Sequence, residues 1–346
     1  MKVSIIITAY SRKNFLEEAL ESAVKQSGGN IETEIILVKN FRDPRIDSIC
    51  ESSGVRVIER EGTIGEYLSD ASARATGEII MFLEDDDVFA SDKARKIVEL
   101  FLCNGDVVLI HNNYFAIDES SRKIEYKRLL DKHHFPGDFN LIFDYKSEKL
   151  SNFISSTNAD FNLSCMCVKK EAITPNFLSF LSTIRSNPDA VLLYYSLSIG
   201  GKVLATGDVL TKYRVHEQGI SQAKNLGMKA DEVQKELDAL LKLKTFLSER
   251  GPAPHSVLQI IDLVIAEFTL MLGLFQRNLS RLKMLRMVLK LVTFDMSVHN
   301  TMRTRLIVFG ILNAISADFA ARLYGWKCGY YTLWCSAFSD CTMQFP

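Results

Sequence analysis

The first third of the chain alternates apolar runs with stretches of helical periodicity. Runs rich in β-branched residues predict strands over residues 3–9, 34–38, 55–58, 78–83 and 106–111. Residues 14–26 carry apolar side chains at helical spacing, and Asn14 followed by Glu17 predicts a capping box at the start of that helix. Strands separated by helices of this length form right-handed βαβ units. The predicted fold class is therefore α/β, with a mostly parallel sheet flanked by helices.

The remainder of the chain changes character near residue 222. Residues 113–221 mix short strands and loops and are interpreted as an elaboration of the first domain. Residues 231–250 predict a polar helix and residues 256–276 an apolar one. A chain of 346 residues is long enough for about two domains. We expect one domain over residues 1–221 and a helical carboxyl-terminal region over residues 222–346.

The carboxyl-terminal region raises the question of membrane contact. Residues 256–276 are long enough to cross a bilayer, but Asp262 and Glu267 would each cost about 2.5–3.5 kcal/mol near its centre. The next segment is basic, and Lys283, Arg286 and Lys290 share one helical face opposite leucines and valines. That pattern is typical of a helix lying on anionic lipid, and it predicts peripheral membrane contact through residues 277–338. A helical bundle with a solvated basic face fits the same pattern.

Composition narrows the possible functions. The 41 Lys and Arg residues nearly balance the 42 Asp and Glu residues, which argues against a nucleic-acid binder. A hydrophobic fraction of 47% excludes a disordered chain. The seven cysteines form no Cys-x-x-Cys pair, and the amino terminus leads into a strand without a signal-peptide pattern. These features favour the cytoplasm, including the inner face of the cell membrane.

The strongest chemical signal is a run of four acids, residues 84–87, that directly follows the apolar strand at 78–83. Open α/β sheets bind ligands at the carboxyl ends of their strands. Adjacent carboxylates repel one another unless a cation neutralises them, and oxygen ligands of this kind suit Mg²⁺ or Mn²⁺. The alternative is a solvated acidic loop.

Two segments together resemble family 2 of the nucleotide-sugar glycosyltransferases. Residues 3–12 read Val-Ser-Ile-Ile-Ile-Thr-Ala-Tyr-Ser-Arg, and residues 76–87 read Thr-Gly-Glu-Ile-Ile-Met-Phe-Leu-Glu-Asp-Asp-Asp. The order, the spacing and the strand context agree with that family, and the resemblance covers about residues 1–221. It implies a GT-A fold, which is Rossmann-like, a bound Mn²⁺ or Mg²⁺, and inversion at the anomeric carbon of the sugar.

The resemblance also implies roles for individual residues. Asp86 and Asp87 would contact the metal and the diphosphate, and Asp85 would face the ribose or the sugar. The nucleotide would lie against the end of the first strand and the residues that follow it: Thr8, Ala9, Tyr10 and Arg12, with Arg12 near phosphate.

One segment departs from the family pattern. After the second strand the family usually has Asp-Asp-Gly-Ser, and an acid there accepts hydrogen bonds from uracil. This chain has Lys39-Asn40-Phe41 instead. Asn40 would still be able to contact a base edge through its amide, so uridine is favoured and guanosine stays open.

Three further segments match the family. Asp189, just before an apolar helix, is the candidate general base that deprotonates the acceptor hydroxyl, although an Asp there also suits a helix N-cap. His216, in Tyr213-Arg214-Val215-His216, is the candidate residue near the metal and diphosphate. Asn162 and Ser164 are predicted on the acceptor side.

Taken together, the sequence predicts an inverting, metal-dependent glycosyltransferase. The donor would be a nucleotide sugar, and the acceptor a hydroxyl or phosphate of a lipid-linked glycan or a surface polysaccharide. A nucleotidyltransferase is an alternative, but it should show a glycine-rich phosphate loop, and residues 8–12 contain no glycine. A non-catalytic nucleotide-binding scaffold is the other alternative.

Overall fold

The computed structural model describes residues 1–26, 31–125, 139–216, 226–251 and 253–276, with scattered residues between 280 and 312. The chain divides into two compact units. One unit comprises residues 1–215 and 246–254, and the other comprises residues 216–245 and 255–346. Most of the basic segment at 277–338 lies outside the described residues, so its membrane contact stays a prediction.

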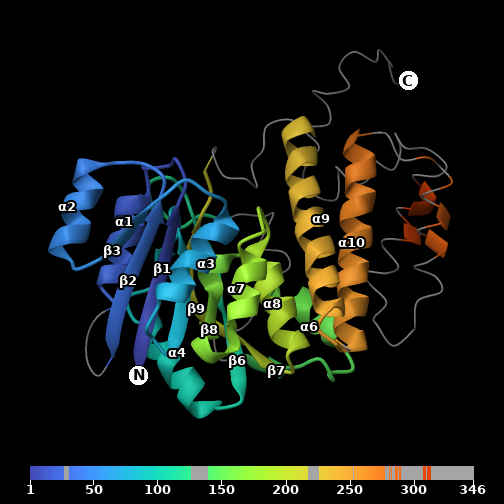
Figure 1. The fold of residues 1–346 in the computed structure, drawn as a ribbon, viewed down its shortest axis with the longest axis horizontal. Helices are drawn as coiled ribbons and strands as arrows, with labels where there is room; N and C mark the ends of the chain where they lie inside the picture. Colours follow the sequence, from blue (N-terminus) through green and yellow to red (C-terminus); the bar gives the residue numbers. More distant parts are fainter. Residues whose placement is uncertain are drawn as a thin grey trace. The chain divides into compact units, whose positions relative to one another are not determined.

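The first unit is built on one sheet (Figure 1). Its strands are β1 (Lys2–Ala9), β2 (Glu32–Lys39), β3 (Arg56–Glu59), β4 (Ile79–Glu84), β5 (Val88–Phe89), β6 (Val107–Ile117), β7 (Asn140–Phe143), β8 (Met166–Lys169) and β9 (Lys202–Arg214). Within the described residues the strand order is β3-β2-β1-β4-β8-β6-β9-β5, with β7 also paired to β9.

The amino-terminal half of this sheet is parallel, which confirms the predicted βαβ arrangement. β1 lies between β2 and β4 and is parallel to both, with Thr8 in register with Val38 and Glu84. The carboxyl ends of these three strands therefore lie along one edge. The sheet then becomes mixed, because β8 runs antiparallel to β4 and β6, whereas β6 and β9 are parallel. The α/β fold class is confirmed.

Helices cover the sheet. In the first unit they are α1 (Leu16–Val24), α2 (Pro44–Ser52), α3 (Ile64–Arg74), α4 (Lys93–Cys103), α6 (Leu150–Thr157), α7 (Pro175–Leu181) and α8 (Pro188–Ser198), with two short 3-10 turns, η1 (Leu163–Cys165) and η2 (Lys170–Ala172). Val3, Ile5 and Ile7 of β1 share a buried core with α1 and α4. Ile6 is equally buried, and because strand side chains alternate it points to the opposite face. The central strands are thus apolar on both faces, as parallel strands covered on two sides must be.

Local sequence sets the starts of some helices but not of α1. At α3, Thr63 and Glu66 form a complete capping box. The predicted capping box at Asn14 is wrong, since α1 begins at Leu16 with Phe15 as its N-cap residue and no side-chain cap. The reason is tertiary, because Glu17 pairs with Arg45 of α2 instead of turning back toward Asn14.

The second unit contains most of α9 (Leu226–Ser248) and all of α10 (His255–Gln276). Lys244 of α9 pairs with Asp262 of α10, so one of the two acids in the apolar helix has a partner. The segment His255–Gly273, with a mean hydropathy of 1.7, is long and apolar enough to cross a bilayer. The core helix of a soluble protein can have the same length and composition.

We predict that Gly65→Ala destabilises the first unit. A Cβ at Gly65 would lie 2.1 Å from the Leu181 carbonyl oxygen and 2.5 Å from that of Ile184, where α3 packs on α7. Overpacking against backbone costs about 1–3 kcal/mol, measurable as a lower urea midpoint. Gly105→Ala is the control, because nothing lies within 4 Å of its Cβ position. An unchanged midpoint for Gly65→Ala would contradict the α3–α7 packing.

Candidate functional site

The acidic run lies at the sheet edge where β1, β2 and β4 end. Glu84 is the last residue of β4, and Asp85–Asp87 form the turn that leads into β5. Asp85 is only 3% exposed and Asp87 only 1% exposed. A solvated acidic loop is therefore excluded.

Burial changes the protonation of these acids. Burial, and then repulsion from Asp86, raises the pKa of Asp85 and of Asp87 to about 7. Burial also raises the pKa of Glu84, with Asp86 and Asp87 adding to the effect. Full ionisation of the run at neutral pH is therefore costly without added positive charge.

Arg12 supplies some of that charge. Its guanidinium lies 2.5 Å from Oδ1 of Asp85 and 2.7 Å from Oδ2 of Asp86. Asp85 also accepts a hydrogen bond from the backbone N–H of Tyr10. Arg12, which the sequence predicts near phosphate, thus pairs with two acids of the run.

Arg214, the last residue of β9, holds the run from another side. Its backbone N–H donates to Asp87 Oδ1 at 2.9 Å, and its Nε donates to the Asp86 carbonyl oxygen at 2.8 Å. The rest of its guanidinium, which is buried, bonds the Asp118 carbonyl oxygen and Glu18 and lies over the ring of Phe15. Arg214 therefore ties the acidic turn to α1 and to β9.

The η1 turn is hydrogen-bonded to the end of β4. Ser164 is fully buried, and its hydroxyl accepts from the Glu84 backbone N–H at 3.0 Å. Its carbonyl oxygen accepts from the buried Lys93 Nζ at 2.6 Å. Asn162 caps η1 through Oδ1, and both Asn162 and Ser164 lower the pKa of Asp87. The structure thus gives Ser164 a supporting contact to the acidic run and places Asn162 beside it.

Asp189, on α8, is the other acid that interacts with the acidic run. It lies in the first turn of that helix, and Asn187 takes the N-cap position instead. Burial raises the pKa of Asp189 to about 7, although the backbone N–H groups of Ala190 and Asn162 partly lower it. Its charge in turn raises the pKa of Glu84, so the two carboxyls interact electrostatically. The predicted base and the acidic run therefore share one site.

The residues predicted to contact the nucleotide lie at the ends of β1 and β2. Thr8 and Ala9 are buried, whereas the ring of Tyr10 is 58% exposed. The amide oxygen of Asn40 accepts from the Ser11 backbone N–H at 2.8 Å. The amide of Asn40 is therefore committed to the neighbouring loop.

Comparison with known proteins identifies the family of the amino-terminal half of the chain. Residues 4–170 match the family described as glycosyl transferase family 2. An uncharacterized glycosyltransferase of Haemophilus influenzae is 27% identical over 188 residues, which is 49% of this chain and 72% of that protein. One of Nostoc is 30% identical over 131 residues, which is 36% of this chain and 40% of that protein. Residues 4–170, just under half of the chain, therefore form a glycosyltransferase family 2 domain.

Solved structures support the fold of the chain. A crystal structure of S. aureus TarS 1–349 in complex with UDP-GlcNAc has a TM-score of 0.55 at 14% identity and covers 100% of this chain and 94% of that one. The longer S. aureus TarS chain gives 0.52 at 15% identity, covering 97% of this chain and 55% of that one. At such identity the likeness concerns the fold, and it confirms the predicted GT-A architecture.

The remaining candidate contacts concern a metal ion. One carboxylate oxygen each of Asp85 and Asp87 is buried and has no hydrogen-bond partner within the described part of the chain, which suits a bound cation. Among those residues no group of three or more His, Cys, Asp or Glu side chains is arranged to hold a metal. His216 is buried and belongs to the second unit, so its role at the metal stays a prediction.

Sequence reasoning missed two residues that support the site. Arg214 stands in the Tyr-Arg-x-His segment, so the motif drew attention to it, but only His216 received a role. Lys93 has no sequence signal, because a lysine at the start of an amphipathic helix is ordinarily solvated. Its burial is a consequence of the fold.

We predict that Asp87→Asn stabilises the metal-free protein at high pH. A carboxyl with a raised pKa binds its proton more tightly in the folded state, so its contribution to stability is lost as pH rises from about 4 to about 7. The Asn side chain removes that loss and keeps the bond from the Arg214 N–H. In chelator we expect a gain of about 1–3 kcal/mol in unfolding free energy at pH 8 and little at pH 5.

The control for this measurement is Asp231→Asn, an exposed position on α9. It should give the same small difference at both pH values. If Asp87→Asn is equally destabilised at pH 5 and pH 8, burial of the Asp87 carboxylate does not destabilise the folded protein at high pH, and the prediction is wrong.

Proposed function

We propose that this chain transfers a sugar from a nucleotide-sugar donor to an acceptor hydroxyl with inversion at the anomeric carbon. The observation that carries the proposal is that the acidic run, with Asp85 and Asp87 buried, and the separate carboxyl of Asp189 interact at one edge of the sheet. An inverting displacement needs both a place for the departing diphosphate and a base for the attacking hydroxyl.

The chain's own residues divide these tasks. Asp86 and Asp87 would hold a divalent cation, which when bound stabilises the negative charge on the leaving diphosphate. Arg214 and the η1 turn keep the acidic run in place. Asp189, with a pKa near 7, takes the proton from the acceptor hydroxyl at its carboxylate oxygen. A base with a pKa near the working pH is well matched to this step.

The donor we propose is a UDP-sugar. TarS, which shares the fold, was crystallised with UDP-GlcNAc and with UDP. The chain spans only two-fifths of the Nostoc relative's length, so the acceptor is proposed from the sequence alone, as a lipid-linked glycan or surface polysaccharide.

The proposal predicts that UDP binds in a manganese-dependent way. Because the buried carboxylates repel a diphosphate, UDP should bind in Mn²⁺ and lose at least about tenfold in affinity in EDTA. Calorimetry with UDP and GDP, each with Mn²⁺ and with EDTA, measures this directly. Binding of neither nucleotide in Mn²⁺ would overturn the donor-site assignment.

A second prediction concerns Asp189→Asn. The amide cannot take a proton, so turnover should fall by about 10²–10⁴-fold while the UDP affinity stays within about twofold. In the unmodified protein, kcat/KM should fall as pH drops below about 7, where Asp189 becomes protonated. Steady-state assays across pH with a UDP-sugar check both points. A variant that loses UDP affinity and turnover in parallel would show that Asp189 serves binding rather than proton transfer.

A further inference from the structure

A carboxylate that the chemistry described so far does not use is hydrogen-bonded to Asn40, the residue that also contacts the loop after Tyr10. Glu61 stands in the loop between β3 and α3, far from the acidic run in sequence, and its side chain is exposed. Asn40, at the end of β2, donates from Nδ2 to Glu61 Oε2 at 3.2 Å. Three loops, after β1, β2 and β3, therefore meet at this point of the sheet edge.

The orientation of the Asn40 amide is fixed by its surroundings. The Ser11 backbone N–H donates a hydrogen bond to the Asn40 amide. Because a donor needs an acceptor, the amide atom that faces it must be Oδ1. Its Nδ2 must then face the other way, toward the Ser11 hydroxyl at 3.2 Å and toward Glu61. Asn40 consequently acts on Glu61 as a donor that steadies the carboxylate.

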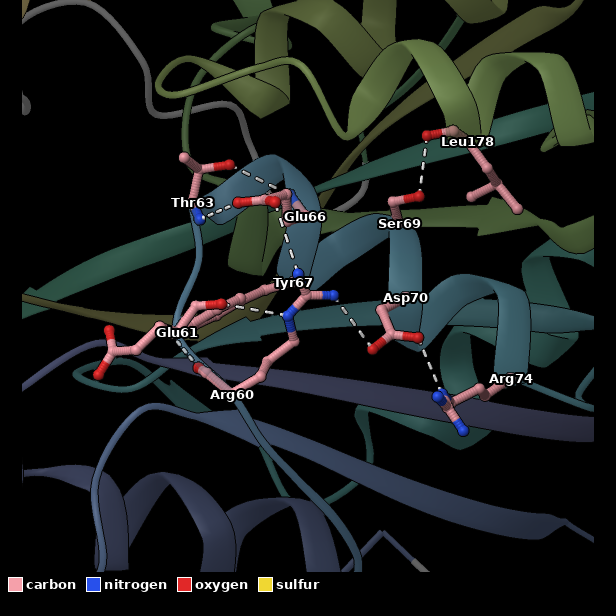
Figure 2. Close-up of polar contacts among 9 residues, drawn as sticks. All are labelled: Arg60, Glu61, Thr63, Glu66, Tyr67, Ser69, Asp70, Arg74 and Leu178. Carbon is pink, nitrogen blue, oxygen red and sulfur yellow. Dashed lines mark hydrogen bonds and ion pairs between the residues drawn. The ribbon is translucent and has the colours of Figure 1, made fainter.

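The adjacent arginine does not neutralise Glu61. Figure 2 shows the Arg60 guanidinium turned toward α3, where it lies 3.4 Å from Glu66 and 3.4 Å from Asp70, while the Glu61 carboxylate points away from it. Among the described residues no ion pair involves Glu61, and no donor reaches its Oε1. One acceptor oxygen thus remains available on Glu61, which Asn40 links to Ser11, the residue after Tyr10.

Tyr10 and Glu61 flank the same buried residue, Tyr67. The Tyr10 ring lies 6.4 Å from the Tyr67 ring, whose hydroxyl donates to the Arg60 carbonyl oxygen. Burial, and then the Glu61 charge, raises the pKa of Tyr67 to about 12. An exposed aromatic face next to a single hydrogen-bond acceptor suits a flat ring that carries one N–H on its edge.

We propose that Glu61 is the specificity-determining residue for the donor base, reading the uracil N3–H with Oε1 while the ring lies against Tyr10. Uracil carries one N–H between two carbonyls, which matches a single available acceptor. Cytosine has a lone pair at the same ring nitrogen, so the carboxylate repels it. This inference rests on the proposed nucleotide-sugar function and deepens it, because the base contact comes from the loop after β3 instead of from Asn40.

The test compares UDP with CDP, which differ only in the base, by calorimetry on the full chain with Mn²⁺. The unmodified protein should bind UDP at least about tenfold more tightly than CDP, since a hydrogen bond to a charged group is lost with CDP. Glu61→Gln is isosteric, and its amide can present either an oxygen or an N–H. It should weaken UDP about tenfold and bring the ratio of the two affinities to within about threefold.

Two further variants separate the possible causes. Glu51→Gln, at another exposed glutamate, on α2, should leave both affinities unchanged. Tyr10→Ala should weaken UDP and CDP alike and keep their ratio, because stacking does not distinguish the two pyrimidines. A Glu61→Gln protein that keeps the UDP/CDP ratio of the unmodified chain overturns the role of Glu61 alone. Binding of neither nucleotide to the unmodified chain overturns the proposed function, and this inference with it.

Discussion

Glu84 and the three aspartates after it stand at the end of a buried strand, and the surrounding fold supplies what allows four acids to remain there. Each carboxylate removed from water loses solvation, and each neighbour adds repulsion. Arg12 offsets part of this cost with its guanidinium, and Arg214 does so with its backbone and side-chain N–H groups. The donors come from the loop after β1 and from the end of β9, so the acidic run depends on the whole sheet being assembled.

The mixed half of the sheet has a specific part in this arrangement. β8 inserts antiparallel between β4 and β6, and the η1 turn that precedes it is thereby placed against the end of β4. Lys93 is buried beneath that turn, and its Nζ bonds the Ser164 carbonyl oxygen and the Thr211 hydroxyl of β9. A purely parallel sheet would place the acids at its edge but would lack the hydrogen bonds from the η1 turn and Lys93 that support them.

The family match ends at residue 170, whereas the compact unit continues through residue 215. The additional segment contains Asp189 and Arg214, which contribute a candidate base and a support for the acidic turn. The site is therefore completed by residues outside the matched region. The carboxyl-terminal helices form a separate unit whose apolar helix α10 pairs one of its acids with Lys244.

The parallel strands, the α/β class, the resemblance to glycosyltransferase family 2 and the acidic run were predictable from the amino-acid sequence, because they depend on local periodicity and on residues adjacent in the chain. It also pointed to Asp189 through a motif. It gave no indication that Lys93 is buried, that Glu61 lies beside Asn40, or that α1 starts without its capping box. Those facts depend on contacts between residues tens of positions apart, such as Glu17 with Arg45 and Asn40 with Glu61. Only the tertiary structure brings such pairs together, since a side chain's environment is set by whatever the fold packs against it.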